Sequence, residues 1–596
     1  MSWKNKIIYQ IYPRSFMDSN GNGTGDLHGI QKKIDYIKQL GVDYVWISPF
    51  FESPQKDFGY DVSDYRKVDN LFGSNEDLKK LLEKFHDANL KMIIDLVISH
   101  TSDKHPWFIE SQKNKKNKYS DWYVWSGKNK EVLPNNWLSV FGGPSWKWHD
   151  EREMFFLHNF LESQPDLNFH NHEVQEQMLN EIKYWLDFGI DGFRFDVINF
   201  IFHDKKLRNN PLKDKSEVRP LGFNKENPYG LQHHIYDNTQ KEVPAYLQKI
   251  RKLLDDYSAI SIGEVVSDKP FETIADYTND ERLHMAYCFE FLSDEFDLNT
   301  VDVIVENFFK ENPKSWPCWA FSNHDSKRIV SRAKVSPKKL MEKLLSLQGN
   351  ICIYQGEELG LPETNINYGD LQDPFGKVFW PDFKGRDGCR TPMPWNSMKK
   401  NYGFSQNKPW LPANEDYKNL DEAQKGLMFA GFLKIFMPIV VVLPGLIAVA
   451  LEGNVIESLG GDRSKAYPSM LSLLPNGILG LTFAALVAAI VSSLASLTNS
   501  LSTIFTMDIY KNYTKVKDTE LVNVGRFAGT SGLILSIIVA PIFLGSLDSA
   551  FQYVQEYMGL FSPVILFVFL SAIFFKKSSS KSVLAGYLVA LVVGVI

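Results

Sequence analysis

The chain has 596 residues, of which 44% are hydrophobic and 23% are charged, and its formal net charge is −6. At ~150 residues per domain this length allows roughly four domains, or fewer when one of them is a large barrel. The composition excludes a small disulfide scaffold, a collagen-like chain and a disordered charged tail. The mildly acidic charge offers no electrostatic basis for binding nucleic acid.

The composition changes near residue 413. All 14 Trp lie between Trp3 and Trp410, and all 13 His lie at or before His324. Residues 413–596 carry 24 charged side chains in 184 positions, whereas the first 412 residues carry 112. The charge density therefore halves, and two different kinds of protein are predicted to share the chain.

The N-terminal sequence MSWKNKIIYQIYPRSF lacks the apolar core of a secretory signal. The four cysteines show no C-x-x-C spacing, and the first three lie in apolar runs. We expect them to be reduced core thiols, which fits a reducing cytosol.

The first 412 residues alternate between short apolar runs and polar stretches of helical periodicity, such as NEDLKKLLEKFHDANL (75–90). The apolar runs lie at 7–13, 42–49, 90–97, 192–196, 259–265, 286–291, 318–325 and 350–359. Eight strands joined mostly by helices favour a closed parallel (β/α)8 barrel over an open doubly wound sheet. The stretch 101–170 is too long for a simple crossover and is expected to form a small inserted domain after strand 3, which leaves 1–100 and 171–412 for the barrel. No G-x-G-x-x-G or Walker A pattern follows a run, which argues against a nucleotide-dependent enzyme.

Polar side chains gather at the predicted carboxyl ends of the strands, where (β/α)8 barrels carry their chemistry. They are Asp95, His100, Arg194, Asp196, Glu264, His324 and Asp325. One such carboxylate alone would more often be a solvated strand end or a cap, but a pair of carboxylic acids can share proton transfer and nucleophilic attack on a glycosidic bond. Arg194 would keep Asp196 ionised. Partial burial would raise the pKa of Glu264 toward that of a proton donor.

Five motifs follow the order seen in one enzyme superfamily. They are DLVISH (95–100), QPDLN (164–168), GFRFD (192–196), GE (263–264) and FSNHD (321–325). Three flanking motifs are GYDVSDY (59–65), HTSDKHPWF (100–108) and GRDGCRTPMPW (385–395). With them, the first 412 residues resemble the α-amylase superfamily of glycoside hydrolases, in its α-glucosidase and oligo-1,6-glucosidase branch.

The resemblance implies roles for individual residues. Asp196 would be the nucleophile, Glu264 the acid/base and Asp325 a transition-state stabiliser. The residues expected to bind the glucosyl ring in the first subsite are Asp61, His100, Arg194, His324 and, as a weaker candidate, Arg386. Ser99 departs from the family, which usually has Asn there to support the loop or a metal.

The linkage that would be cleaved stays open between α-1,4 and α-1,6. Val197, the residue after the nucleophile, leans toward α-1,6 by likeness to the family. The following segment INFIFHDKKLRNNP (198–211) looks more like α-glucosidases that act on maltose-type substrates.

An acidic and amide-rich loop near the N-terminus has the spacing of the first nine positions of a calcium loop. Its candidate ligands are Asp18, Asn20, Asn22, Thr24 and Asp26. Position 12 is Gly29, so the loop is not an EF-hand, and a plain Gly/Asn-rich turn is the alternative. Similar glucosidases carry a structural Ca²⁺ here, which makes Ca²⁺ the expected cofactor.

The second part contains five apolar stretches, at 427–451, 476–498, 527–547, 557–575 and 583–596. The first four reach the ~20 residues that span a bilayer, so a multi-pass membrane part of about five helices is predicted. Lys and Arg concentrate in loops 507–526 and 576–581, which the positive-inside bias puts in the cytoplasm. Counting back, residue 426 and the glucosidase part would face the cytoplasm.

Four segments of this part resemble the sodium/solute symporter family, especially sodium/glucose cotransporters. They are NLDEAQKGLMFAGFLK (419–434), FAALVAAIVSSLASLTNSLSTIFTMDIY (483–510), VNVGR (522–526) and FQYVQEYMGLFSP (551–563). By this likeness Ala489, Ser492 and Ser493 would contribute to a Na⁺ site, and Lys434 and Gln555 would face the sugar. Such symporters build one midplane site from two inverted repeats. Only the later helices are matched over 418–596, so we expect an incomplete Na⁺ site.

The junction predicts a fusion of two truncated genes, either a natural rearrangement or a product of sequence assembly. No eighth barrel helix or C-terminal β domain is recognisable, so an open seam is expected to expose the outer faces of strands 8 and 1.

Three functions remain: a retaining α-glucosidase on short α-glucosides, a sodium-coupled sugar transporter, or a non-catalytic glucosidase-like transporter subunit. The intact carboxylates favour the first. The expected partners are small α-glucosides and a lipid bilayer, and the oligomeric state stays open.

Overall fold

The computed structural model describes residues 3–214, 227–279, 281–294, 296–333, 335–414, 417, 475–503, 505–506, 510, 514 and 518–544. The chain divides into two compact units, Met1–Gln424 and Lys425–Ile596. Each is described by itself.

The first unit is built on eight parallel strands. They are β1 (Ile7–Ile11), β2 (Tyr44–Ile47), β5 (Lys91–Leu96), β9 (Gly192–Phe195), β10 (Ile260–Val265), β11 (Met285–Cys288), β12 (Cys318–Ala320) and β13 (Asn350–Tyr354). Their order is β11-β10-β9-β5-β2-β1-β13-β12, and a parallel bridge from Ala286 to Pro317 joins the two ends. The predicted (β/α)8 barrel is therefore confirmed.

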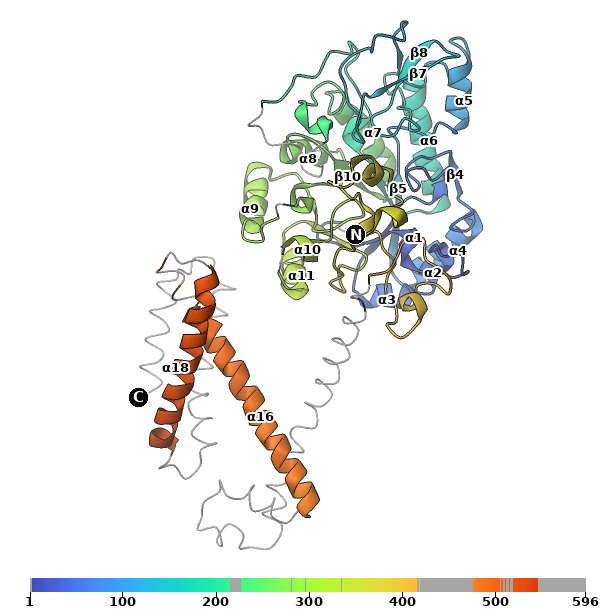
Figure 1. Cartoon of the computed structure of the whole chain (residues 1–596). Helices are drawn as coiled ribbons and strands as arrows, with labels where there is room; N and C mark the ends of the chain where they lie inside the picture. The colour runs from blue at the N-terminus through green and yellow to red at the C-terminus, as the bar shows by residue number, and fades with distance from the viewer. Residues whose placement is uncertain are drawn as a thin grey trace. The chain divides into compact units, whose positions relative to one another are not determined.

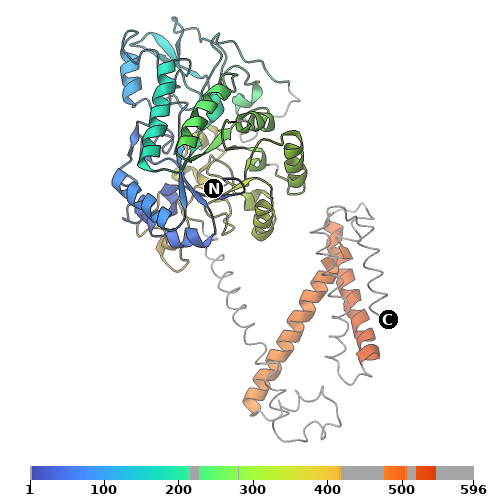
Figure 2. The same cartoon turned by 180° about the vertical axis from the view of Figure 1, so that it is seen from behind.

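Helices surround these strands in both views (Figures 1 and 2). They are α1 (Pro13–Phe16), α2 (Leu27–Gln31), α3 (Ile34–Gln39), α4 (Asn75–Asp87), α6 (His172–Phe188), α7 (Val243–Asp256), α8 (Pro270–Thr278), α9 (Val301–Glu311), α10 (Ile329–Ala333), α11 (Pro337–Leu345) and α12 (Pro374–Phe379). Short 3₁₀ turns follow several strands: η1 (Ile198–Phe200), η2 (Pro228–Leu231), η3 (Glu290–Leu292), η4 (Tyr368–Asp370), η5 (Asp387–Cys389) and η6 (Lys400–Gly403).

Helix α4 shows why these segments are helical. Ser74 and Asp77 form a capping box at its start. Its buried residues Leu78, Leu81, Leu82 and Phe85 recur at spacings of three and four, so one face packs on the barrel.

The segment 101–170 contains α5 (Pro106–Lys113) and a three-stranded antiparallel sheet. The sheet strands are β6 (Trp125–Ser126), β7 (Trp146–His149) and β8 (Met154–Leu157), with order β6-β8-β7. A second small ribbon pairs β3 (Phe51–Glu52) with β4 (Asp64–Val68). The loops of both segments reach the carboxyl ends of the barrel strands.

Side chains alternate between two cores along the barrel strands. Ile8, Trp46 and Ile262 belong to the cluster inside the barrel, whereas Tyr9 and Ile351 belong to the layer between strands and helices. This is the period of two that strands impose. The three cysteines whose side chains are described, Cys318, Cys352 and Cys389, are free and buried, as expected for core thiols.

The expected open seam beside strands 8 and 1 is wrong for the described residues. The outward-facing side chains Tyr9, Ile351 and Ile353 are at most 7% exposed. The Tyr9 hydroxyl donates to Oε1 of the half-buried Glu358 at 2.7 Å, and the Tyr36 hydroxyl of α3 donates to the same oxygen at 2.6 Å. The hydroxyls thus tie strand 1, the loop after strand 8 and a helix together. The outer faces of strands 8 and 1 are therefore covered.

Tyr417, beyond the expected end of the barrel at 412, also belongs to this core. It is 1% exposed, its hydroxyl lies 3.1 Å from that of Thr391, and its ring lies 5.7 Å from Tyr402. Chain beyond residue 412 therefore still packs on the barrel.

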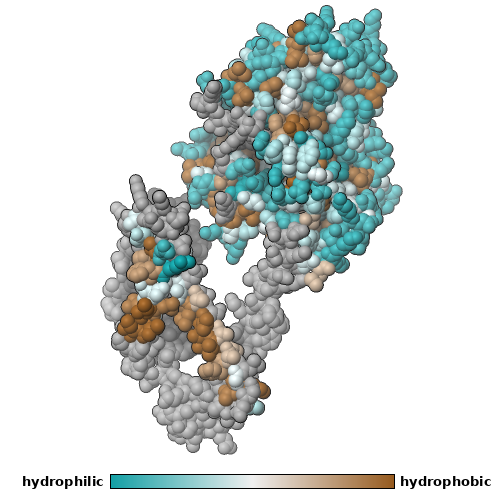
Figure 3. Space-filling view, in the orientation of Figure 1, coloured by the Kyte–Doolittle hydropathy of each residue, from teal (hydrophilic) through white to brown (hydrophobic). Residues whose placement is uncertain are grey.

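The described part of the second unit consists of two long helices, α16 (Asn476–Thr503) and α18 (Asp518–Leu544). They touch through small residues: Ser502 donates to the carbonyl of Gly525 at 2.7 Å, and a Cβ on Gly529 would meet Thr498 at 3.1 Å. Apolar side chains gather on their surfaces (Figure 3).

Among the described residues no helix combines the length and the apolarity needed to cross a membrane, so α16 and α18 do not confirm the predicted spans 476–498 and 527–547. The predicted spans 427–451, 557–575 and 583–596 lie outside the described residues, as do Lys434 and Gln555. Ala489, Ser492 and Ser493 lie on α16, but their side chains fall outside the described part of the chain. The predicted sodium site stays a prediction.

Candidate active site

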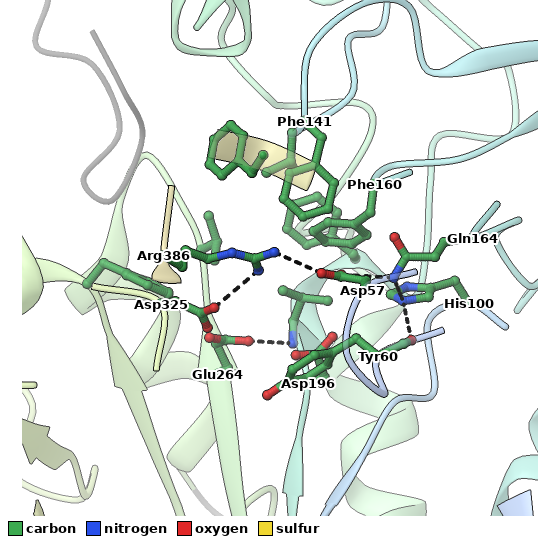
Figure 4. A pocket seen from close by; sticks show the side chains of 16 residues that line it. Asp57, Tyr60, His100, Phe141, Phe160, Gln164, Asp196, Glu264, Asp325 and Arg386 are labelled. Atoms are coloured by element: carbon green, nitrogen blue, oxygen red, sulfur yellow. Dashed lines mark hydrogen bonds and ion pairs between the residues drawn. The ribbon is translucent and has the colours of Figure 1, made fainter. Parts of the chain in front are cut away.

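A pocket opens at the carboxyl ends of the barrel strands (Figure 4). Its lining consists of Asp57, Tyr60, His100, Val140, Phe141, Phe160, Gln164, Asp196, Val197, Phe200, Glu264, Val266, Phe289, Asp325, Phe375 and Arg386. The lining contains five of the eight residues to which the family resemblance gave roles, namely His100, Asp196, Glu264, Asp325 and Arg386. Asp61, Arg194 and His324 are not among the lining residues.

Arg194 lies beneath the pocket, fully buried on β9. Its Nη1 contacts Asp196 Oδ1 at 2.6 Å and Asp95 Oδ1 at 2.8 Å, and its Nη2 contacts Glu264 Oε2 at 2.6 Å. Asp95 is its direct partner in the pairing of β5 with β9, and Glu264 comes from β10 on the other side. The order of strands thus places three carboxyl groups around one guanidinium.

Burial dominates the protonation of these acids. It raises the pKa of Glu264 to about 8 and that of Asp196 to about 7, while Arg194 lowers both. The raised pKa of Glu264 has the direction expected for an acid on an apolar strand. The expectation that Arg194 keeps Asp196 ionised is corrected: removal from water outweighs the guanidinium, so the pKa of Asp196 lies above its ordinary value.

Asp325 has the opposite character. Burial acts to raise its pKa, but His324, Arg386 and Arg390 outweigh this effect and hold the pKa below its usual range. Arg390 Nη2 lies 2.8 Å and Arg386 Nη1 3.2 Å from Asp325 Oδ1. At a pH at which Glu264 is still protonated, Asp325 is therefore ionised.

Two histidines lie at different depths. His324 is fully buried, with Nδ1 2.7 Å from Gln10 and its ring stacked on Tyr60 at 5.5 Å, so it supports Tyr60 and Asp325 from behind. His100 lines the pocket, and its Nδ1 lies 2.9 Å from the hydroxyl of Ser99. Ser99 thus orients the imidazole ring. Burial lowers the pKa of His100 to about 3, which keeps the ring neutral.

Asp57, four residues before Asp61, lines the pocket, whereas Asp61 does not. Asp57 pairs with Arg386 Nη2 at 2.8 Å, which Figure 4 marks with a dashed line. Asp61 is fully buried and accepts hydrogen bonds from the hydroxyl of Ser53 and the backbone N–H groups of Lys56 and Asp57. It shapes the loop that presents Asp57. The motif GYDVSDY begins after Asp57, so no local signal marked that residue.

Val197 holds an unusual backbone conformation directly after Asp196. Its φ of 34° lies in the left-handed region, which a β-branched residue rarely enters. This conformation aims its N–H at Glu264 Oε2, 3.1 Å away. Such strain costs on the order of 1–3 kcal/mol and is concentrated at functional sites.

Sequence analysis also missed Tyr287, the partner of Glu264 in the pairing of β10 with β11. Its hydroxyl accepts from Arg194 Nη2 at 2.7 Å and Nε at 3.2 Å, and it donates to Glu264 Oε1 at 3.0 Å. Because both acceptor positions face the guanidinium, the hydroxyl hydrogen is directed at the acid. An alternating strand containing one Tyr carries no signal that could have shown this.

The acidic loop at 18–26 fits a hard cation in its chemistry. Asp18 accepts N–H groups of Asn20, Gly21 and Gly23, and Asn20 and Asn22 each accept the N–H two residues on, so the loop curls around side-chain oxygens. All candidate ligands are oxygens, as Ca²⁺ prefers. Within the described residues no group of three or more His, Cys, Asp or Glu side chains is arranged for a metal. A Ca²⁺ here would need amide and carbonyl oxygens as well.

The sequence matches the family model "Alpha amylase, catalytic domain" over residues 10–436. The chain belongs to the alpha-amylase family. This family domain is a glycoside hydrolase domain, and the barrel and its acids belong to it. The match also extends past residue 412, in agreement with the packing of Tyr417.

Relatives and solved structures agree with this family membership. The chain is 49% identical to "Probable alpha-glucosidase" of Rhizobium meliloti (strain 1021), covering 70% of this chain and 77% of the relative. It is 36% identical to "Oligo-1,6-glucosidase" of Bacillus cereus, covering 71% and 80%. Among solved structures, the alpha-glucosyl transfer enzyme XgtA is 51% identical with a TM-score of 0.69, covering 71% and 81%.

The model of the sodium:solute symporter family matches residues 415–590. It agrees with the resemblance seen in the sequence and overlaps the alpha-amylase match by about twenty residues. The two matches together cover most of the chain.

Asp57→Asn and Asp61→Asn form a matched pair that separates the two positions. Asp57→Asn should lower kcat/KM on maltose by about 10–100-fold, because an ionic contact at the pocket is lost. Its Tm should fall less than that of Asp61→Asn, because Arg386 keeps Asp325 and Asp373 as partners. Asp61→Asn should lower Tm by several degrees, because an amide NH₂ would face one of the N–H or O–H donors. Steady-state kinetics and thermal melts of both variants check this. The opposite pattern would return Asp61 to the pocket.

Proposed function

We propose that the chain is a retaining α-glucosidase that hydrolyses short α-1,4- or α-1,6-glucosides. The single observation that carries this proposal is the contact of Asp196 and Glu264 with opposite nitrogens of one guanidinium. Contacts of 2.6 Å to the two terminal nitrogens of Arg194 hold both carboxyl groups beside one guanidinium, and a retaining mechanism requires the two groups to lie ~5–5.5 Å apart. Relatives named "Maltase 1" and "Oligo-1,6-glucosidase" are each 36% identical to the chain, so both linkages stay in the proposal.

The residues divide the reaction between them. Asp196 attacks the anomeric carbon while Glu264 gives its proton to the glycosidic oxygen. A water molecule then attacks the anomeric carbon and gives one proton to Glu264, while the bond from that carbon to Asp196 breaks. Asp325, kept ionised by two arginines, would stabilise the positive charge that develops on the sugar ring. His100, Asp57 and Arg386 lie where the ring's hydroxyls would bind.

The stereochemistry of the product tests the proposal. Hydrolysis of p-nitrophenyl α-glucoside, whose leaving group is not a sugar, followed by proton NMR should show α-glucose as the first product. Asp196→Ala should lower kcat by at least about 10⁴-fold, since no covalent intermediate forms, without loss of the folded barrel. Formation of β-glucose first would exclude Asp196 as a nucleophile.

The pH dependence of kcat/KM on maltose should be a narrow bell. Asp196 must be ionised, so activity falls as the pH drops below about 7, and Glu264 must be protonated, so activity falls as the pH rises above about 8. The limbs report the pair of acids together. With p-nitrophenyl α-glucoside the alkaline limb should weaken, because that leaving group needs no proton. An alkaline limb that is equally steep for both substrates would contradict the assignment of Glu264.

We further propose a structural Ca²⁺ in the loop that contains Asp18, Asn20, Asn22, Thr24 and Asp26. The curled side-chain oxygens support it. Saturating Ca²⁺ at about 100 times its Kd would add ~2.7 kcal/mol to the free energy of unfolding, so EDTA should lower Tm by several degrees. All Trp lie between Trp3 and Trp410, so Trp fluorescence follows this unit alone.

Two variants make the calcium experiment specific. Asp18→Ala should abolish the difference between Ca²⁺ and EDTA, whereas Asp35→Asn, an exposed position on α3, should preserve it. Equal Tm values of the parent chain in Ca²⁺ and in EDTA would show that the loop is a plain turn.

We propose that the second unit is a membrane part and that the enzyme in the first unit faces the cytoplasm. The symporter match and the Lys and Arg residues in the loops of the second unit support this proposal. Ala489, Ser492 and Ser493 would supply only part of a Na⁺ shell. In liposomes with an inward Na⁺ gradient we therefore expect the chain to stay in the lipid fraction without uptake of labelled glucose. Uptake abolished by Ser493→Ala, or recovery of the chain in the aqueous fraction, would contradict this.

A further inference from the structure

The amide of Gln10 is a polar group in the apolar interior of the barrel. Gln10 lies on β1 two residues after Ile8, so its side chain points inward with the cluster to which Ile8 belongs. It is fully buried, and its Nε2 lies 2.7 Å from His324 Nδ1 and 3.2 Å from Ser48 Oγ. Each amide hydrogen therefore has an acceptor. A buried polar group in such a place calls for a reason other than packing.

The other ring nitrogen of His324 faces two oxygens. Its Nε2 lies 3.0 Å from Asp325 Oδ2 and also contacts the hydroxyl of Tyr60. That hydroxyl donates its own hydrogen to Asp95 at 3.1 Å, so it presents an oxygen lone pair to the ring. Asp325 is ionised and can only accept. A hydrogen on Nε2 therefore satisfies both oxygens, whereas a lone pair on Nε2 would face two others.

The surroundings of His324 leave the ring one uncharged form. Tyr60 stacks on it at 5.5 Å and Tyr12 at 5.9 Å, so two aromatic neighbours hold its plane. Burial lowers the pKa of His324 well below its usual value, so only one ring nitrogen carries a hydrogen. With that hydrogen on Nε2, Nδ1 needs a donor. The amide of Gln10 is this donor.

We propose that Gln10 is a positioning residue that fixes His324 in the tautomer whose Nε2–H supports Asp325, the proposed transition-state stabiliser. This inference rests on the proposed α-glucosidase function and adds a residue to the same site. Asp325 lines the pocket in Figure 4, whereas Gln10 is not among the described residues of the lining. Gln10 therefore acts through the histidine ring and not through contact with the substrate.

Gln10→Glu tests the tautomer, because it replaces the donating NH₂ group by an oxygen in nearly the same volume. The introduced carboxyl group and His324 then share one additional proton. While that proton is present, on either group, Nε2 keeps its hydrogen. Once it is lost, the carboxylate holds the remaining ring hydrogen at Nδ1, and Nε2 presents a lone pair to Asp325. The support of Asp325 thus becomes dependent on pH.

The variant should be most active at acid pH and lose activity as the pH rises, since a carboxylate partner raises the pKa of an imidazole. On p-nitrophenyl α-glucoside, the ratio of its kcat to that of the parent chain should fall at least about tenfold between about pH 5.5 and about pH 8.5. Its KM should change less than about threefold, because the lost interaction belongs to the transition state. The full-length chain is measured in detergent.

The ratio isolates the introduced titration. The limbs from Asp196 and Glu264 are common to both chains and cancel. The charged and titratable groups around the ring of His324 are also common to both, namely Tyr12, Tyr60, Asp95, Arg194, Asp325, Arg386 and Arg390.

Two further variants separate the tautomer from a general disturbance. Gln10→Met offers Nδ1 no hydrogen, so it should lower kcat about tenfold by the same factor at every pH. Gln248→Glu is the matched control, an exposed position on α7, and its ratio to the parent should stay near one throughout.

A ratio for Gln10→Glu that is constant with pH would overturn the role of Gln10 and keep the glucosidase. Should Gln10→Glu not fold, as judged by its thermal melt, Gln10→Met decides: a kcat equal to that of the parent would overturn the role as well. Absence of hydrolysis by the parent chain would overturn both proposals.

Discussion

The first unit depends on one buried cation. Arg194 has no exposed surface, and Asp95, Asp196 and Glu264 all contact it within 2.8 Å. Three carboxylates in such a dry place would repel one another and lose their hydration, so without the guanidinium they could be held together only in neutral form. The arginine permits some negative charge here, and burial decides how much. The result is a set of acids with different protonation in one small space.

The separation of these acids is what the proposed chemistry needs. Asp325 pairs with two arginines and stays ionised, whereas Glu264 shares Arg194 with two other carboxyl groups and keeps its proton to a higher pH. The local backbone contributes as well, since the left-handed turn at Val197 directs an N–H at Glu264. Similar groups in different environments thus acquire different roles.

The barrel accounts for the arrangement of groups around the pocket. Each strand end contributes one sector, so the order of strands around the barrel becomes the order of chemical groups around the substrate. The segment 101–170 adds Phe141, Phe160 and Gln164 from the opposite side. The second unit, matched to symporters, shares the chain but none of the described residues of this pocket.

Much of the barrel could be predicted from the sequence alone. The spacing of the apolar runs indicated eight parallel strands, and Arg194 and Asp196, two residues apart at the end of one run, had to face the same side. The motifs placed Glu264 and Asp325 at the ends of other strands. These inferences need only the periodicity of a strand and the rule that barrel chemistry lies at the carboxyl ends.

Only the tertiary structure decided the rest. Asp57 and Asp61 are four residues apart in one loop, and which of them reaches the pocket depends on Arg386, more than 320 residues away. Tyr287 on β11 acquires its partners from the neighbouring strand β10 and from β9, one strand further along the barrel. The pKa of Asp196 reflects the water removed by the whole barrel, and the covered strip beside strands 8 and 1 reflects contacts of Tyr9, Tyr36 and Glu358. Local sequence determines which way a side chain faces along its own strand. Desolvation and long-range pairing depend on everything packed around it, so they exist only once the barrel has closed.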